Sequence, residues 1–144
     1  MPDLHIRLAR WDEVGPVAGA IRTRVFVEEQ GVPAELEWDA VDADCWHAIA
    51  TNAQGQPVGT GRLLPDGHIG RMAVLAEARG AGVGMAILQA LIAQARILGY
   101  AEVVLHAQTH AEPFYRRAGF VREGAVFMEA GIEHIAMRLA LDHA

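Results

Sequence analysis

The spacing of apolar and polar residues predicts a strand and then a helix at the start of the chain. Residues 4–9 alternate between apolar and polar side chains, as a half-buried strand does. Apolar residues then recur at helical spacing from Val14 to Phe26, and Asp12 is expected to cap this helix. The Gln-Gly-Val-Pro sequence at residues 30–33 is expected to follow its end.

The pattern over the next segment predicts three consecutive strands. Residues 46–51 and 56–64 are rich in apolar residues and are separated by Asn-Ala-Gln-Gly, a hairpin signal. A Pro-Asp-Gly turn then leads to residues 69–74, an apolar and partly β-branched run. We expect this run to be a buried strand, paired antiparallel with the hairpin before it.

A buried helix is predicted next, because residues 85–98 are almost free of charge and contain no proline. Gly99 is expected to close this helix. Residues 101–107 have the pattern of a buried strand. A strand, a helix and a second strand form a crossover connection, so the strands at residues 69–74 and 101–107 should be parallel.

The end of the chain is expected to form a short helix and a hairpin. Residues 111–120 carry Pro113 in the first turn and Gly119 at the end, which is typical of a short helix. Residues 121–128 and 132–141 are expected to pair around a Glu-Ala-Gly turn. The whole pattern predicts one α/β domain over residues 1–144, with a mixed, mostly antiparallel sheet of about six to seven strands flanked by helices.

Composition narrows the class of protein further. The chain has 144 residues, enough for one domain, and a net charge of −6, which offers no basic surface for nucleic acid or an anionic membrane. No apolar run approaches the roughly 20 residues of a membrane span, and the start of the chain lacks a signal-peptide pattern. The single cysteine, Cys45, permits no internal disulfide. A cytoplasmic protein is expected.

Two absent residue types exclude whole classes of enzyme. The chain contains no lysine and no serine, and all 12 basic residues are arginine. A Walker-type phosphate loop and a Schiff-base enzyme each need a lysine, so both are excluded. A Ser-His-Asp hydrolase is excluded for lack of its nucleophile.

A glycine-rich turn joins the strand at residues 69–74 to the long helix. It reads Arg-Gly-Ala-Gly-Val-Gly over residues 79–84, and backbone N–H groups at a helix start suit a phosphate or pyrophosphate. The dinucleotide pattern G-x-G-x-x-G fails, because its third position is Met85 or Ile87 in the two registers. The turn is therefore expected either to bind a different phosphorylated ligand or to serve only as a link between strand and helix.

Three segments in this order resemble the GCN5-related N-acetyltransferase (GNAT) family. They are residues 70–74 (Gly-Arg-Met-Ala-Val), the glycine turn at residues 79–84, and residues 114–120 (Phe-Tyr-Arg-Arg-Ala-Gly-Phe). Residues 25–33 further resemble a bacterial branch whose substrates are mostly unassigned. The resemblance covers nearly the whole chain and implies a GNAT-like fold in which the parallel strand pair splays apart at a coenzyme site.

The resemblance also implies a chemistry for the chain. Acetyl-CoA would be the co-substrate, and the acetyl group would pass directly to a primary amine, with a homodimer consistent with the family. Backbone groups of the strand would bind the pantetheine amides, and an N–H near Val74 would face the thioester oxygen. Tyr115 would be the general acid toward the leaving sulfur. The coenzyme-binding residues so implied are Met72, Ala73, Val74, Arg79, Gly80, Ala81, Gly82, Val83, Gly84 and Tyr115.

An acidic segment precedes the first hairpin and leaves two interpretations open. Residues 28–44 hold seven carboxylates and no basic residue, so they form either a solvated loop or the rim of a pocket for a cationic amine such as a polyamine, an aminosugar or a protein lysine. An amine with a pKa of about 10.4 must lose a proton before it attacks. Glu29 is the first candidate for that base, followed by His47 and His110, and His106 is expected to lie with His110 close to the cleft. The expected acceptor-binding residues are Glu28, Glu29, Glu37, Asp39, His47 and His110.

The remaining chemically competent residues point to no further activity. His47, His106, His110 and His134 lack the spacing of a metal site, so no metal is expected. Cys45 lies beside Asp44, which should raise the pKa of its thiol and disfavour a nucleophilic role. The alternative to an enzyme is a catalytically silent acyl-CoA-binding or regulatory domain on the same fold.

Overall fold

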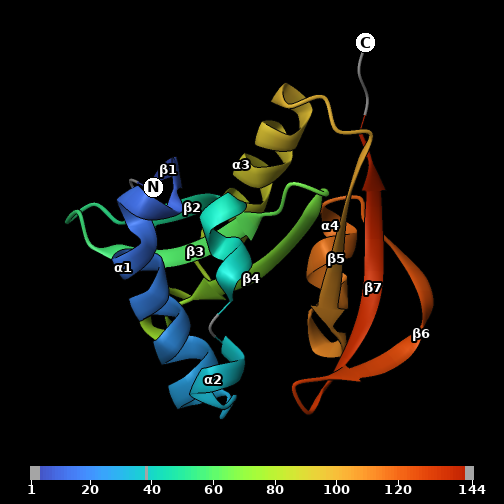
Figure 1. The fold of residues 1–144 in the computed structure, drawn as a ribbon, viewed down its shortest axis with the longest axis horizontal. Helices are drawn as coiled ribbons and strands as arrows, with labels where there is room; N and C mark the ends of the chain where they lie inside the picture. Colours follow the sequence, from blue (N-terminus) through green and yellow to red (C-terminus); the bar gives the residue numbers. More distant parts are fainter. Residues whose placement is uncertain (1–3, 38, 142–144) are drawn as a thin grey trace.

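Seven strands form one mixed sheet in the order β1-β2-β3-β4-β5-β7-β6 (Figure 1). The computed structural model describes residues 4–37 and 39–141. The strands are β1 (His5–Arg10), β2 (Trp46–Thr51), β3 (Pro57–Leu63), β4 (His68–Val74), β5 (Glu102–Gln108), β6 (Val121–Glu129) and β7 (Ile132–Ala140). All seven were expected from the sequence, with bounds that differ by a residue or two.

Helices and helical turns connect these strands. Within the described residues, the α-helices are α1 (Trp11–Arg22), α2 (Ala34–Glu37), α3 (Val83–Ile97) and α4 (Glu112–Arg117). A π-helical segment, η1 (Thr23–Glu29), continues α1, and three 3₁₀ turns complete the set: η2 (Ala40–Asp44), η3 (Ala76–Ala78) and η4 (Thr109–Ala111). The continuous helical segment formed by α1 and η1 ends at Glu29, just before residues 30–33, as the sequence predicted. Asp12 is not its cap, because the helix begins at Trp11 and Asp12 lies in the first turn.

The parallel pair β4–β5 is where the sheet opens. Every other pair of neighbouring strands is antiparallel. The two parallel strands pair only at His68↔Val104 and Ile69↔Leu105. Beyond this point they diverge, and Figure 1 shows β1–β4 and β5–β7 as two wings of the sheet. The expected parallel and splayed pair is therefore confirmed.

A β-bulge in β4 accompanies the divergence. Thr60 pairs with Ala73 and Arg62 pairs with Gly70, so one residue of β3 lies opposite two residues of β4. Arg71, at the bulge, has a φ of 48°, which is uncommon for a residue other than glycine. A bulge bends its strand and increases its twist. Here it sets the direction of β4 just beyond Ile69, the last residue of the strand that pairs with β5.

The helices cover opposite faces of the sheet. In β2, Ile49 packs in the cluster that contains Val14 and Ala18 of α1. Its neighbours in β2, Ala48 and Ala50, pack in the main core, to which α3 contributes Val83, Ile87, Leu88, Leu91, Ile92 and Ala95. Side chains alternate between the faces of a strand, so α1 and α3 lie on opposite sides. The sequence pattern of α3, apolar on nearly every side, reflects this burial.

Two glycines of β3 allow α3 to pack closely against the sheet. A Cβ added to Gly61 would lie 2.9 Å from Ile87 Cγ2 and 3.0 Å from Leu91 Cδ1. A Cβ on Gly59 would lie 2.8 Å from Ile87 Cδ1. Such distances leave no room for a methyl group.

We therefore expect Gly61→Ala to lower the free energy of unfolding by about 1–3 kcal/mol, because the extra methyl group overpacks the interface. Gly19→Ala in α1 is the matched control, because a Cβ there meets nothing within 4 Å. Alanine in place of a helical glycine should raise the unfolding free energy by about 0.5–1 kcal/mol. Urea denaturation measures both, and equal effects for the two variants would contradict the packing argument.

Candidate active site

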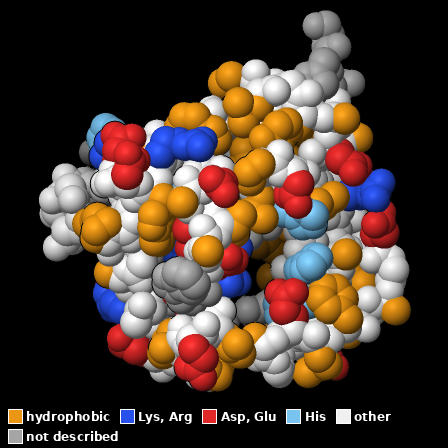
Figure 2. Space-filling model, in the orientation of Figure 1, with side chains coloured by type: hydrophobic (Ala, Val, Ile, Leu, Met, Phe, Trp, Pro, Cys, Tyr) orange, Lys and Arg blue, Asp and Glu red, His pale blue; other side chains and the backbone are white. Residues whose placement is uncertain are grey.

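A pocket of about 780 Å³ lies where β4 and β5 diverge. Its walls come from η1, β4, β5, the start of α4 and the turn between β6 and β7. Figure 2 shows this face hollowed between the two halves of the molecule, with histidine side chains gathered on the β5–β7 half. Sites in open sheets commonly lie where neighbouring strands separate. This pocket is therefore the candidate active site.

The glycine turn presents backbone groups at the start of α3. Gly80 and Gly82 both have a φ of 82°, a left-handed conformation that glycine adopts without strain. Gly82 is the N-cap residue of α3, and no side chain of the described residues caps this helix. A Cβ on Gly84 would lie 3.3 Å from Phe114 Cζ, so glycine lets α4 approach. The turn fits a pyrophosphate group, which the first-turn N–H groups would bind.

Arg79 is held in place by two neighbours. Its Nη1 and Nη2 donate to the carboxylate of Glu29 at 2.6 and 2.7 Å, and its Nε donates to the carbonyl of Val74 at 3.0 Å. Arg79 thus ties the glycine turn to the end of β4 and to η1. These contacts suit a residue that fixes the turn, and both guanidinium Nη atoms are engaged with Glu29.

The same ion pair bears on the expected role of Glu29. The hydrogen bonds from Arg79 hold the pKa of Glu29 below its usual value. A carboxylate that binds its proton more weakly is a poorer general base. The geometry therefore disfavours Glu29 as the base, and its carboxylate instead orients Arg79. Glu28 is exposed and lies outside the lining of the pocket.

Tyr115 lies at the edge of β4, on the pocket wall. Its hydroxyl is 3.9 Å from the sulfur of Met72, and its ring makes edge contacts with Phe114 and Phe120. Burial raises the pKa of Tyr115 to about 12. The phenol therefore stays protonated and can donate a proton at neutral pH. Met72, Ala73 and Val74 line the same pocket.

Three carboxylates of the acidic segment pair with arginines that lie far away in sequence. Asp42 accepts from Arg22 Nη1 at 2.9 Å and from Arg62 Nη1 at 2.8 Å. Glu37 pairs with Arg22, and Asp39 accepts from Arg62 Nη2 at 2.9 Å. These pairs weaken the interpretation of this segment as the rim of a pocket for a cationic amine. Glu37 and Asp39 do line the pocket, but their charges are engaged in these pairs.

His47 lies outside the pocket, contrary to expectation. Its side chain is buried beside Trp11, and its Nε2 is 2.9 Å from the carbonyl oxygen of Asp42. Burial lowers the pKa of His47. His110, at η4, does line the pocket and is exposed. Of these two histidines, only His110 can contact an acceptor bound in the pocket.

Cys45 is buried and unreactive. Its sulfur donates to the carbonyl of Val41 at 3.3 Å, and burial raises the pKa of the thiol to about 11. The thiol is therefore protonated at neutral pH, in line with the expectation that it is no nucleophile.

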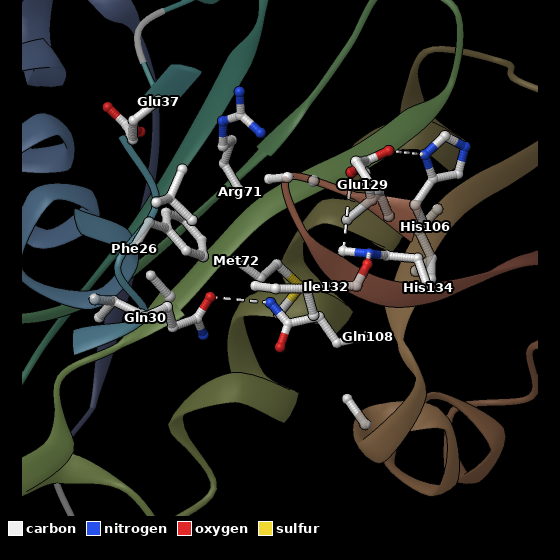
Figure 3. A pocket seen from close by; sticks show the side chains of 18 of the residues that line it. Phe26, Gln30, Glu37, Arg71, Met72, His106, Gln108, Glu129, Ile132 and His134 are labelled. Atoms are coloured by element: carbon white, nitrogen blue, oxygen red, sulfur yellow. Dashed lines mark hydrogen bonds and ion pairs between the residues drawn. The ribbon is translucent and has the colours of Figure 1, made fainter. Parts of the chain in front are cut away.

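The wall opposite Arg71 carries a cluster of which the sequence placed only His106 near the cleft (Figure 3). His106 Nδ1 is 2.9 Å from Glu129 Oε1, and His134 Nε2 is 3.9 Å from Glu129 Oε2. The Nδ1 of His134 is 2.7 Å from the carbonyl of Ile132, which can only accept a hydrogen bond. His134 in its neutral form therefore carries its proton on Nδ1 and presents an unprotonated Nε2 on the side of Glu129. Among the described residues, no group of three or more His, Cys, Asp or Glu side chains could hold a metal ion.

One hydrogen bond crosses from one wall of the pocket to the other. Gln108 Nε2, on β5, donates to Gln30 Oε1, at the end of η1, at 3.1 Å (Figure 3). Both side chains line the pocket. This contact links the segment after α1 to the β5–β7 half of the molecule.

A parallel strand pair that diverges beside a glycine turn is a feature of the fold of acyl-CoA-dependent acyltransferases. A family model described as an acetyltransferase (GNAT) domain matches residues 12–141. The chain therefore belongs to the GNAT family. Membership makes acyl transfer its reaction class and an acyl-CoA its co-substrate.

Individual relatives and solved structures agree with this assignment. The chain is 40% identical over 121 residues to the uncharacterized N-acetyltransferase YjcF of Bacillus subtilis, a match that covers 81% of this chain and 86% of the relative. An acyl-CoA N-acyltransferase from Pseudomonas aeruginosa superimposes with a TM-score of 0.85 at 32% identity, covering 96% of this chain and all of that one. Escherichia coli ElaA gives a TM-score of 0.83 at 26% identity over 93% of this chain and 98% of its own. No described helix is long and apolar enough to cross a membrane.

Proposed function

We propose that the chain transfers an acetyl group from acetyl-CoA directly to a primary amine bound in the pocket between β4 and β5. One observation carries the proposal. Tyr115 lines the pocket where β5 leaves the edge of β4 unpaired, and its hydroxyl lies 3.9 Å from the sulfur of Met72 in β4. An acid placed at this edge can serve a leaving group bound along it.

The residues around the pocket fit the coenzyme. The N–H groups of residues 80–84 would hold the pyrophosphate at the start of α3. On the side of β4 that faces β5, the residues beyond Ile69 have no strand partner among the described residues. Their backbone groups can therefore pair with the pantetheine amides, which would lie there like an added strand. An N–H near Val74 would stabilise negative charge on the thioester oxygen. Acetyl-CoA supplies the activated acyl group.

Tyr115 and His134 would carry the two proton transfers. As the amine nitrogen attacks the carbonyl carbon and the carbon–sulfur bond breaks, Tyr115 donates its proton to the departing thiolate. The proton of the amine passes to Nε2 of His134, whose protonated form Glu129 would stabilise. We prefer His134 to Glu29 as the base because Arg79 occupies both oxygens of Glu29. His110 remains a proposed contact to the acceptor.

Release of free thiol from acetyl-CoA, measured over a panel of amines, tests the proposal. We expect release only in the presence of particular amines, together with formation of the N-acetylated product by mass spectrometry. Binding of acetyl-CoA without release on any amine would instead support a catalytically silent acyl-CoA-binding domain. Longer acyl-CoA esters in the same assay establish whether acetyl is the preferred group.

A further inference from the structure

We infer that the acceptor amine also carries an anionic group, a carboxylate or a phosphate, and that Arg71 binds it. The inference rests on the proposed function, because it names the class of acceptor that the same pocket would take. It departs from the cationic acceptor that the acidic segment suggested.

Arg71 lines the pocket with much of its hydrogen-bonding capacity unused. Its Nε is buried and has no hydrogen-bond partner among the described residues. Its Nη2 contacts the carbonyl of Leu36 at 3.5 Å and lies 3.9 Å from Asp39 Oδ2, both at the outer limit of such interactions. A guanidinium group offers five donors in a planar fork that matches carboxylate and phosphate oxygens. Arg71 is therefore equipped to bind an anion that the pocket admits.

The other carboxylates on this side of the pocket already have closer partners. Asp39 pairs with Arg62 at 2.9 Å, Glu37 pairs with Arg22, and both oxygens of Glu29 pair with Arg79. Because each has its own arginine at short range, none offers Arg71 a strong ion pair.

The surroundings of Arg71 favour an incoming negative charge. Burial, followed by repulsion from Arg62 and Arg22, lowers the pKa of Arg71. A bound carboxylate or phosphate would offset both of these effects. A second cation, such as the far ammonium of a polyamine, would add to the repulsion.

The opposite wall suits the amine end of the same molecule. Glu129, with His106 and His134 beside it, presents hydrogen-bond acceptors from the β5–β7 half of the pocket (Figure 3). Arg71 presents donors from β4. A ligand with an amine and an anionic group can satisfy both walls at once, which a simple alkyl amine or a polyamine cannot.

Matched acceptors test the inference. Thiol release from acetyl-CoA is measured with amino acids against their carboxamides, with phosphoethanolamine against ethanolamine, and with spermidine. We expect kcat/KM to be about 10–100-fold higher for the anionic member of at least one pair, which is the effect of a hydrogen-bonded charged group. The pair that shows the preference distinguishes a carboxylate from a phosphate. Equal rates within both pairs, or a preference for spermidine, would overturn the inference and leave the acyltransferase function standing.

Substitutions at Arg71 connect the preference to this side chain. Asparagine tolerates a positive φ, so Arg71→Asn removes the guanidinium with little backbone strain, and Arg71→Lys keeps the charge but loses the fork. We expect both to reduce the ratio of kcat/KM between the anionic and neutral acceptors, Arg71→Asn to near one, with thermal unfolding confirming that each variant is folded. An undiminished ratio in a folded Arg71→Asn variant would contradict the assignment.

A direct binding measurement separates the inference from the proposed function. Calorimetric titration of the protein–CoA complex with the preferred anionic acceptor and its neutral counterpart needs no turnover. Binding that depends on Arg71 without acyl transfer would support the anion site and contradict the enzyme. Turnover without any preference for the anionic acceptor would support the enzyme and contradict the anion site.

Discussion

Tyr115→Phe is expected to lower kcat by about 10²–10⁴-fold, the usual contribution of a general acid. The phenyl ring preserves the edge contacts with Phe114 and Phe120, so the change removes the hydroxyl and little else. Affinity for acetyl-CoA should change little, because the proposed coenzyme contacts come from the backbone of β4 and the glycine turn. Steady-state kinetics and calorimetry with acetyl-CoA measure the two quantities.

Tyr100→Phe is the matched control for this substitution. Tyr100 is the other of the two tyrosines in the chain, and it lines a separate, smaller pocket. We expect its kcat to stay near that of the wild type. A Tyr115→Phe variant with an unchanged kcat would remove the proposed acid from the mechanism.

The raised pKa of Tyr115 also predicts the pH dependence of the reaction. A phenol with a pKa of about 12 holds its proton at all lower pH values and loses it only above them. Ionisation of Tyr115 therefore should not reduce kcat between neutral pH and about pH 10, the range in which an ordinary tyrosine would begin to ionise. A fall in kcat with an apparent pKa near 10 that is present in the wild type and in Tyr100→Phe alike would contradict the raised pKa of Tyr115.

Asp42→Asn is expected to produce the largest loss of stability. Asp42 is buried and holds the guanidinium groups of Arg22 and Arg62, both buried as well. Removing one member of a buried ion pair costs about 3–5 kcal/mol because charges are left without compensation. This is a large share of the roughly 5–15 kcal/mol by which domains are stable. Asp44→Asn, at an exposed carboxylate two residues away, should change stability by less than about 0.5 kcal/mol.

The pH dependence of stability gives a second measure of the Asp42 network. Burial opposes ionisation of Asp42, but hydrogen bonds from Arg22 and Arg62 outweigh it and lower the pKa. A lowered pKa in the folded state contributes stability that is present above the unfolded value of about 3.9 and is lost as pH falls through the folded value. Urea unfolding of the wild type should therefore weaken more steeply below about pH 4 than that of Asp42→Asn. Parallel curves for the two proteins would contradict the network's role.

Local sequence patterns were sufficient for the fold because each element has its own signal. The alternation of apolar and polar residues predicted β1, turn residues predicted the hairpins, and a run almost free of charge predicted α3. The crossover rule then established that β4 and β5 are parallel. The coenzyme half of the site followed from resemblance, since the glycine turn and Tyr115 lie in segments that the family shares.

The acceptor half could not be predicted in the same way, because it depends on contacts between distant residues. The seven carboxylates of residues 28–44 suggested a negative surface, yet the arginines that neutralise Glu37, Asp39 and Asp42 come from α1 and β3. A count of charges within one segment cannot detect such partners.

The remaining site residues could not be predicted, because their positions depend on strand register and on backbone conformation. Gln108 pairs with His134, and His106 pairs with Ala136, which brings His106 and His134 to one face. The hairpin was predicted, but its register against β5 was not, so the cluster around Glu129 was missed. The position of Arg71 depends on the bulge in β4, for which the sequence carried no recognised signal.

The most direct test of the account follows an isotopically labelled acetyl group from acetyl-CoA in the presence of an accepted amine. The account predicts that the label appears in the N-acetylated amine only when that amine is present, and that intact-protein mass spectrometry finds none of it on the enzyme. Label that stays in acetyl-CoA with every amine, or that accumulates on the protein before the amine is added, would contradict direct transfer in this pocket.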